Sequence, residues 1–189
     1  MSKEDVTKRA MAGDIPVYCA FDEIVAVEDL RPNPKNPNQH PARQVELLAK
    51  IIESQGWRQA VKVSTRSGLI VSGHGRYQAA LLLGCPVPVD LQDYPSEAEE
   101  LADLLADNRI AELANIEKSA LAEIFAEITA EDIDASLSGY SEADIDIIMA
   151  ELSESITEDD LESFFVDAEP KEKQPKRTQC PHCGEWIEK

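Results

Sequence analysis

The chain has 189 residues, 43% of them hydrophobic, which is enough for one well-buried core with a small appendage. No apolar run comes near the roughly 20 residues that a membrane-spanning helix needs. The first residues also lack the apolar centre of a secretion signal. These features favour a cytoplasmic protein without a role in a membrane.

Charge is distributed unevenly along the chain, whose net charge is −19. Residues 1–90 carry 11 Lys and Arg against 10 Asp and Glu, residues 91–170 carry 2 against 24, and residues 171–189 carry 5 against 3. The acidic middle repels a nucleic-acid backbone, because phosphate contacts need Lys and Arg. We therefore expect any anion site in the first half. In the second half, a solvated surface, a protein-binding face and a mimic of nucleic-acid charge are the alternatives.

The first 90 residues alternate between strand and helix patterns, which predicts an α/β (α+β) fold with a small mixed sheet. Residues 1–14 are expected to form a loose leader or a short helix. Pro88 favours an edge position for the strand that contains it, since proline cannot donate to a ladder. The expected elements are strand at 17–27 with a turn near Asp22, strands at 61–64, 69–71 and 87–91, and a helix from Pro41 to about Gln55.

A glycine-containing turn, Ser72-Gly73-His74-Gly75-Arg76, follows the apolar run at 69–71 and precedes a helix that ends near Gly84. Helix N-termini present free N–H groups and a partial positive charge, and glycine lets a phosphate approach the backbone. Arg76, in the first turn, would add a bidentate contact to phosphate. An ordinary strand-to-helix turn with a surface arginine fits the same pattern.

From Pro95 onward the chain has helical periodicity and few cations. Ser96 with Glu99 is a capping-box pattern, and Ser141 with Asp144 behind it begins the last helix. Beyond about residue 154 the composition is that of a linker. The helix positions expected to be buried are Leu101, Leu104, Leu105, Leu121, Ile124, Phe125, Ile128, Ile145, Ile148, Met149 and Leu152.

Three separated signals occur in one order: a loop at 30–41 rich in proline and asparagine, the glycine turn, and Ala106-Asp107-Asn108-Arg109. The combination resembles the ParB/sulfiredoxin superfamily over roughly residues 22–150. More narrowly, it resembles the ParB-like domains of phages and prophages that often accompany DNA methyltransferases. The resemblance implies a small mixed sheet with packed helices, then an acidic helical extension and a flexible tail. The expected divisions are a leader at 1–14, a nucleotide-binding domain at 15–115, the acidic extension at 116–153, a linker at 154–178 and a Cys-x-x-Cys knuckle at 179–189.

The resemblance also implies a site for a nucleoside triphosphate with Mg²⁺. Asp107 and Asn108 match the family's pair near magnesium, and a carboxylate with an amide oxygen suits a hard cation. A helix-end cap with a salt bridge explains the same residues without a ligand. The family's turn is usually Gly-Glu-Arg-Arg, so His74 and Gly75 leave one positive charge fewer. The implied nucleotide-binding residues are Asn33, Asn36, Ser72, Gly73, His74, Gly75, Arg76 and Arg109.

The implied function is a phage-type nucleotide-binding module that is accessory to DNA modification or packaging through a protein partner, with a homodimer as one candidate assembly. Specific DNA binding by this chain alone is disfavoured, because the acidic helices replace a basic helix-turn-helix domain. A nuclease or nucleotide-dependent phosphotransferase is the alternative, with Arg76, His74 or a carboxylate from residues 22–29 as catalytic candidates. Sulfiredoxin activity is disfavoured because His74 occupies the catalytic cysteine position. An acidic protein-binding decoy is the third hypothesis.

The segment around Cys180 and Cys183 is half of a zinc-ribbon pattern. Zinc needs four ligands, so this pair would require a second chain or distant residues. An unmetallated remnant and a redox dithiol are the alternatives. Cys19 and Cys85 lie among apolar residues and are expected to be buried thiols rather than disulfide partners.

Overall fold

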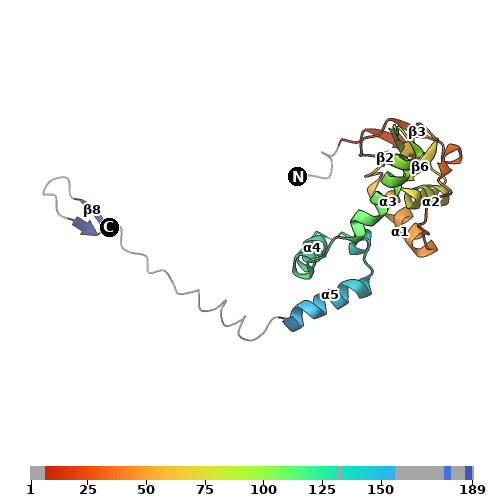
Figure 1. The fold of residues 1–189 in the computed structure, drawn as a ribbon. Coiled ribbons are helices and arrows are strands. Elements are labelled where there is room, and N and C mark those ends of the chain that lie inside the picture. The colour runs from red at the N-terminus through yellow and green to blue at the C-terminus, as the bar shows by residue number, and fades with distance from the viewer. Residues whose placement is uncertain (1–6, 132, 156–176, 180–185, 189) are drawn as a thin grey trace. The chain divides into compact units, whose positions relative to one another are not determined.

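The structure is a computed structural model that describes residues 7–131 and 133–155 and two short strands near the C-terminus (Figure 1). It contains two compact units, residues 1–146 and 147–189. In the second unit, β8 (Arg177–Gln179) and β9 (Trp186–Glu188) form an antiparallel pair. Within the described ranges, no helix has both the length and the apolar character to cross a membrane.

The first unit begins with an antiparallel hairpin of β1 (Ala10–Ala12) and β2 (Ile15–Val17). Ala12 and Val17 are fully buried, so the expectation of a loose leader or short helix is wrong here. The sequence signal for this hairpin is Gly13-Asp14, because Gly13 has a φ of 63° and supplies the tight turn between the strands. A hydrogen bond joins the hairpin to the core: the backbone N–H of Trp57 donates to the Pro16 carbonyl at 2.8 Å.

A five-stranded mixed sheet forms the centre of the unit, in the order β3-β7-β5-β6-β4. β5 and β6, both predicted as strands, make an antiparallel hairpin, whereas β5 and β7 are parallel. The edge position predicted for β7 is wrong, because β3 and β5 flank it. Pro88 is tolerated since pairing with β5 begins only at Val89. The strands are β3 (Glu23–Val25), β4 (Arg31–Pro32), β5 (Val61–Ser64), β6 (Leu69–Ser72) and β7 (Val87–Gln92).

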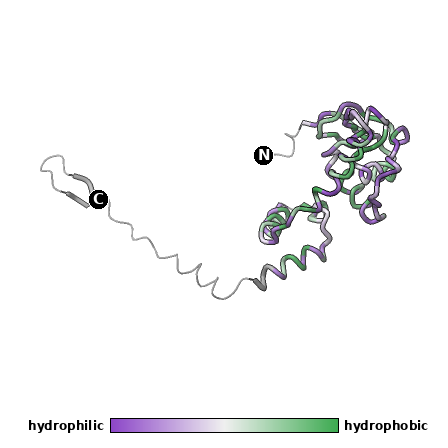
Figure 2. Tube along the Cα trace, in the orientation of Figure 1, coloured by the Kyte–Doolittle hydropathy of each residue, from purple (hydrophilic) through white to green (hydrophobic). Residues whose placement is uncertain are grey.

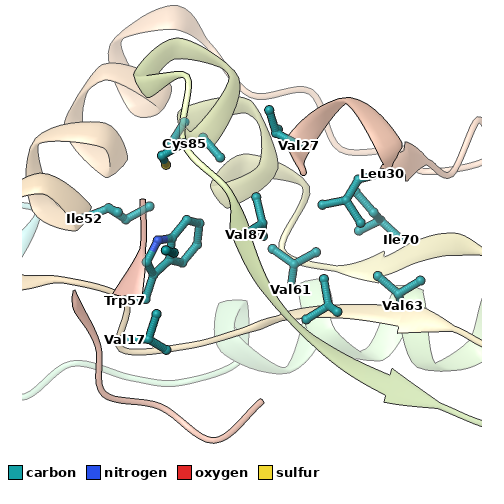
Figure 3. Packing of buried hydrophobic residues seen from close by; sticks show 14 of the residues in the cluster. Val17, Val27, Leu30, Ile52, Trp57, Val61, Val63, Ile70, Cys85 and Val87 are labelled. Atoms are coloured by element: carbon teal, nitrogen blue, oxygen red, sulfur yellow. The ribbon is translucent and has the colours of Figure 1, made fainter. Parts of the chain in front are cut away.

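Helices α1 (Ala42–Gln55) and α2 (His74–Leu83) pack against each other and contribute to the same core as the strands. Figure 3 shows Ile52 of α1 beside Trp57, with Val87 of the sheet on the other side of the indole ring. α1 ends at Gln55 as predicted, with Gly56 as its C-cap, and α2 ends before Gly84, the predicted glycine. A short 3₁₀ turn, η1 (Val27–Asp29), connects β3 to β4 and buries Val27. The α/β fold class predicted from the sequence is confirmed.

Helix α3 (Glu97–Glu112) begins at Ser96, whose hydroxyl accepts the Glu99 N–H as predicted. Among the leucines expected to be buried, Leu104 is 1% exposed as predicted, but Leu105 is 54% exposed, and Glu100 is buried in addition at 1% exposed. The helix turns Leu104 and three acidic residues toward the β5–β6 hairpin. These acidic residues are Glu100, Asp103 and Asp107, and each accepts hydrogen bonds from side chains of β5, β6 or the turn between them.

The chain then forms α4 (Lys118–Ala130), the 3₁₀ turn η2 (Ala135–Ser138) and α5 (Glu142–Ser155). Hydrophobic and hydrophilic residues alternate along these elements (Figure 2). Phe125 is buried and meets the Tyr140 ring edge-to-face at 5.3 Å. Ile124, expected on the buried face, is 52% exposed. Ser141 and Asp144 cap α5 reciprocally, as predicted.

Candidate functional site

The turn between β6 and α2 presents a helix N-terminus that no described side chain caps. Gly73 is the N-cap residue and has a φ of +91°, a conformation that favours glycine. A Cβ at Gly73 would lie 3.0 Å from Nη2 of Arg76, so glycine also permits the close approach of that guanidinium. The backbone N–H groups of His74, Gly75 and Arg76 have no intrahelical partner, because they belong to the first turn. This turn therefore offers donors to an anion.

The Arg76 side chain lies back over Gly73 and is held by the segment before β5. Its Nη1 donates to Gln59 Oε1 at 2.6 Å, and its Nη2 donates to the Ala60 carbonyl at 3.3 Å. Its Nε is buried and has no hydrogen-bond partner among the described residues. Burial lowers the pKa of Arg76, and the charge of Asp107 opposes that effect. Because an arginine stays protonated in proteins, the turn carries a fixed, partly desolvated positive charge.

A carboxylate from α3 lies on the other side of the same turn. Ser72 is buried, and its hydroxyl donates to Asp107 Oδ2 at 2.7 Å. The next residue, Asn108, donates its Nδ2 to the Leu104 carbonyl at 3.1 Å, which leaves its Oδ1 as an acceptor. The structure thus brings the glycine turn and the Asp107-Asn108 pair together, although 35 residues separate Ser72 from Asp107.

Two cavities meet at Arg76 and Asp107, which line both of them. The smaller, about 220 Å³, lies at the N-terminus of α2 and is also lined by Gly73, His74 and Asn108. The larger, about 470 Å³, has walls of mixed charge. Its charged residues besides the shared pair are Asp22, Arg58, Lys62 and Asp90.

His74 is buried, and its Nε2 accepts the backbone N–H of Asn33 at 3.2 Å. Burial, and then the charge of His40, lower the pKa of His74 to about 4, while Asp107 acts in the opposite direction. The imidazole is therefore neutral at pH 7 and carries its proton on Nδ1. The lone pair on Nε2 is already occupied, so this geometry does not favour His74 as a general base.

The remaining predicted nucleotide-binding residues lie apart from the two cavities or behind their walls. Arg109 is exposed, pairs with Glu112 at 2.8 Å and lines neither cavity. Asn36 forms its hydrogen bonds to described residues within its own loop, where its Oδ1 accepts the Asn38 N–H at 3.2 Å. Asn33 is buried behind His74, which it contacts through its backbone.

Sequence reasoning did not assign several residues that line the cavities or hold Arg76. Gln59 follows Trp57-Arg58 in a segment without any motif, so no local pattern marks it. Gln44 and Leu48 of α1 line the small cavity, and neither belongs to a motif. His40 lies at the end of the proline-asparagine loop and also lines the small cavity. These residues are brought there by tertiary structure.

Asp107 and Asn108 are the described residues that could hold a magnesium ion together with phosphates. The described residues hold no group of three or more His, Cys, Asp or Glu side chains suited to a metal. Asp107 and Asn108 together supply two oxygen ligands, and Mg²⁺ commonly binds one or two carboxylates together with substrate phosphates and water. Those two residues would hold the ion, which would neutralise phosphate charge.

The cysteines divide between the core and a segment outside the described residues. Cys19 and Cys85 are free thiols, and burial raises the pKa of each. Cys85 is buried as expected, whereas Cys19 is only partly buried and lines the larger cavity. Cys180 and Cys183 lie outside the residues that the structure describes, so the zinc hypothesis stays a prediction.

Comparison with known proteins gives a likeness at the level of structure. No family model matches the chain, and no curated protein matches it. A solved structure of the C-terminally truncated chromosome-partitioning protein ParB from Caulobacter crescentus, complexed with CTP-γ-S, aligns with a TM-score of 0.58 over 77% of this chain and 84% of that one. The chain has a ParB-like fold.

This ParB-like fold is shared at 21% sequence identity, a level that establishes the fold alone. A second structure of the same ParB, complexed to the centromeric parS site, aligns with a TM-score of 0.40 at 19% identity over 77% of this chain and 78% of that one. That score is too low to support an argument. The ParB-like fold implied by the three sequence signals is confirmed.

Proposed function

We propose that the chain is a nucleoside-triphosphate-binding module that seats the phosphates at the N-terminus of α2. The observation that carries this proposal is the meeting of an uncapped helix N-terminus, the Arg76 guanidinium and the Asp107 carboxylate at one small cavity. Backbone N–H groups and an arginine are the donors that phosphate oxygens use most readily. CTP is the first candidate, because the similar ParB structure contains CTP-γ-S.

Magnesium is part of the proposal for an electrostatic reason. Asp107 lines the small cavity where the phosphates are proposed to bind, and its carboxylate repels a free triphosphate. A Mg²⁺ ion held by Asp107 and Asn108 would offset this repulsion and would neutralise phosphate charge. Binding should therefore require Mg²⁺, and removal of the metal with a chelator should abolish it.

We further propose that the module acts in DNA transactions through a protein partner, as an accessory to DNA modification or packaging in a phage or prophage setting. Residues 91–170 carry 2 Lys and Arg against 24 Asp and Glu, which opposes direct contact with a DNA backbone. An acidic helical region is better suited to a basic protein surface. The proposal also includes a homodimer of this chain.

Calorimetric titration of CTP, ATP and GTP with Mg²⁺ tests the nucleotide claim. Arg76→Ala should weaken the preferred nucleotide by tenfold or more, since a charge-assisted hydrogen bond contributes about 1.5–3 kcal/mol. Arg109→Ala is the matched control, because it removes the same charge from an exposed ion pair outside the cavities. Equal affinity in wild type and Arg76→Ala, or equal losses in both variants, would overturn the proposal. If no nucleotide binds while a partner protein does, the acidic decoy is supported instead.

Phosphoryl transfer is a second candidate, and the larger cavity is the observation that favours it. This cavity of about 470 Å³ shares Arg76 and Asp107 with the small cavity proposed to bind the phosphates. It has room for a molecule that accepts the phosphoryl group. Asp22 also lines it, and one of its carboxylate oxygens accepts the Leu91 N–H at 2.7 Å. Phosphate release, or DNA nicking, above the Arg76→Ala background would support an enzyme over a binding module.

A further inference from the structure

The proline-asparagine loop is joined to the first turn of α2 at two points. At its start, the buried backbone N–H of Asn33 donates to His74 Nε2 across 41 residues of sequence. At its end, His40 packs against Gly75, where a Cβ would lie 3.3 Å from His40 Nδ1. The two adjacent residues that open α2 therefore hold both ends of the loop.

Asn33 is also the centre of the loop's own first turn. Its side-chain Oδ1 accepts the Lys35 N–H at 2.9 Å, and its carbonyl accepts the Asn36 N–H at 3.1 Å. A change at the Asn33 backbone is thus transmitted to the next three residues. Lys35 of this part of the loop also forms an ion pair with Glu97, which is exposed and so contributes little.

In this arrangement His74 acts as a hydrogen-bond acceptor for the Asn33 N–H, a role that requires no proton transfer. The imidazole is 8% exposed and lines the same small cavity as Gly73 and Arg76. Its Nδ1 carries the proton, so Nε2 can accept the Asn33 N–H. Asp107 from α3 and His40 from the loop are the charged or titratable groups that act on it.

We propose that His74 is a positioning residue that latches the loop at 33–40 onto the N-terminus of α2 and thereby sets the affinity of the small cavity for its nucleotide. The nucleotide part rests on the proposed function. The latch itself is a property of the protein without ligand. An acceptor at the position of Nε2 is what the latch requires.

Three variants of the full chain separate this role from a merely structural one. His74→Gln places an amide oxygen near the position of Nε2 and should keep the latch. His74→Asn places its oxygen near the position of Nδ1, too short to reach Asn33, and should lose it. His74→Ala has no acceptor and should also lose it. Glu97→Ala removes the exposed ion pair and serves as the control.

The first readout needs no nucleotide: hydrogen exchange at the Asn33 amide, with the Val63 amide in β5 as an internal reference for folding. Exchange at Asn33 should be at least tenfold faster in the Ala and Asn variants and close to wild type in the Gln variant and in Glu97→Ala. Trypsin cleavage after Lys35 should accelerate in the same two variants. Unchanged Asn33 exchange in His74→Ala, with Val63 protected, would overturn the latch.

The second readout is affinity for the nucleotide that wild type prefers. The Ala and Asn variants should bind at least fivefold more weakly, and the Gln variant should bind like wild type. If exchange follows the acceptor but affinity does not change, the latch holds and its positioning role is refuted. If wild type binds no nucleotide, the proposed function fails, while the exchange pattern still decides the latch.

Discussion

The buried carboxylate of Glu100 gives the sharpest stability prediction. Glu100 is 1% exposed and accepts hydrogen bonds from the Ser64 hydroxyl at 2.6 Å and the Ser67 hydroxyl at 2.8 Å. It also pairs with Arg66, whose Nη2 lies 2.9 Å away. Burial alone would raise the pKa of Glu100, but the two hydroxyls and the guanidinium outweigh it, and the pKa lies below its ordinary value. The group is therefore ionised and fixes α3 against the β5–β6 hairpin.

Glu100→Ala removes every one of these acceptors and leaves their donors in place. Breaking a buried ion pair costs about 3–5 kcal/mol, and the lower end applies because Arg66 is 34% exposed and can regain water. Ser64 is fully buried and loses its partner, which adds about 1 kcal/mol. We expect the free energy of unfolding to fall by about 4 kcal/mol, a large part of the 5–15 kcal/mol typical of a domain.

Urea unfolding followed by circular dichroism measures this change, with Glu97→Ala on the same helix as the matched control. The Glu97 ion pair is exposed, so its loss should move the midpoint little. Glu100→Gln, which keeps the volume, should fall between wild type and Glu100→Ala. If Glu100→Ala unfolds at the same midpoint as Glu97→Ala, the claim that the buried Glu100 carboxylate fixes α3 against the β5–β6 hairpin is refuted.

Two further predictions concern pH and backbone conformation. Because the pKa of His74 is about 4 in the folded protein and near 6.5 when unfolded, its neutral form stabilises the fold above pH 6.5. Up to about 3 kcal/mol of that stability is lost as the pH falls from 6.5 to 4, and His74→Gln should abolish this component in urea titrations at several pH values. Gly56→Ala should cost more than about 2 kcal/mol in thermal unfolding, since φ is +74° and a Cβ would lie 2.5 Å from the Pro16 carbonyl oxygen. Gly84→Ala, with φ +63° and nothing within 4 Å, should cost only the roughly 1 kcal/mol of the left-handed backbone; equal losses at both positions would contradict this account.

The limits of sequence reasoning are clearest in α3. Helical periodicity correctly predicted a helix that begins at Ser96, but it assigned the buried face to leucines. The face that meets the sheet carries Leu104 as predicted, but it also carries Glu100 and Asp107, whose partners are hydroxyls and cations on the β5–β6 hairpin. Apolar spacing cannot reveal such a face, because acidic residues are buried only when a distant segment supplies their donors.

The same distinction separates the site residues that sequence could and could not predict. Gly73 and Arg76 belong to one local turn, so their closeness in space follows from their closeness in sequence. Arg109 is adjacent to Asn108 in sequence but points to Glu112, a choice that depends on how α3 is rotated against the sheet. Gln59, which holds Arg76, carries no motif and could not be found before the fold was known.

The central claim is that phosphates bind the backbone at the start of α2, and backbone amide shifts on titration with Mg²⁺ and CTP test it most directly. Two-dimensional ¹H–¹⁵N spectra of the full chain should show the largest saturable shifts at the amides of Gly73, His74, Gly75 and Arg76, with smaller shifts at Asp107 and Asn108. The same titration of Arg76→Ala should need a nucleotide concentration at least tenfold higher. Saturable shifts centred on another surface, with the amides of 73–76 unmoved, would contradict the account.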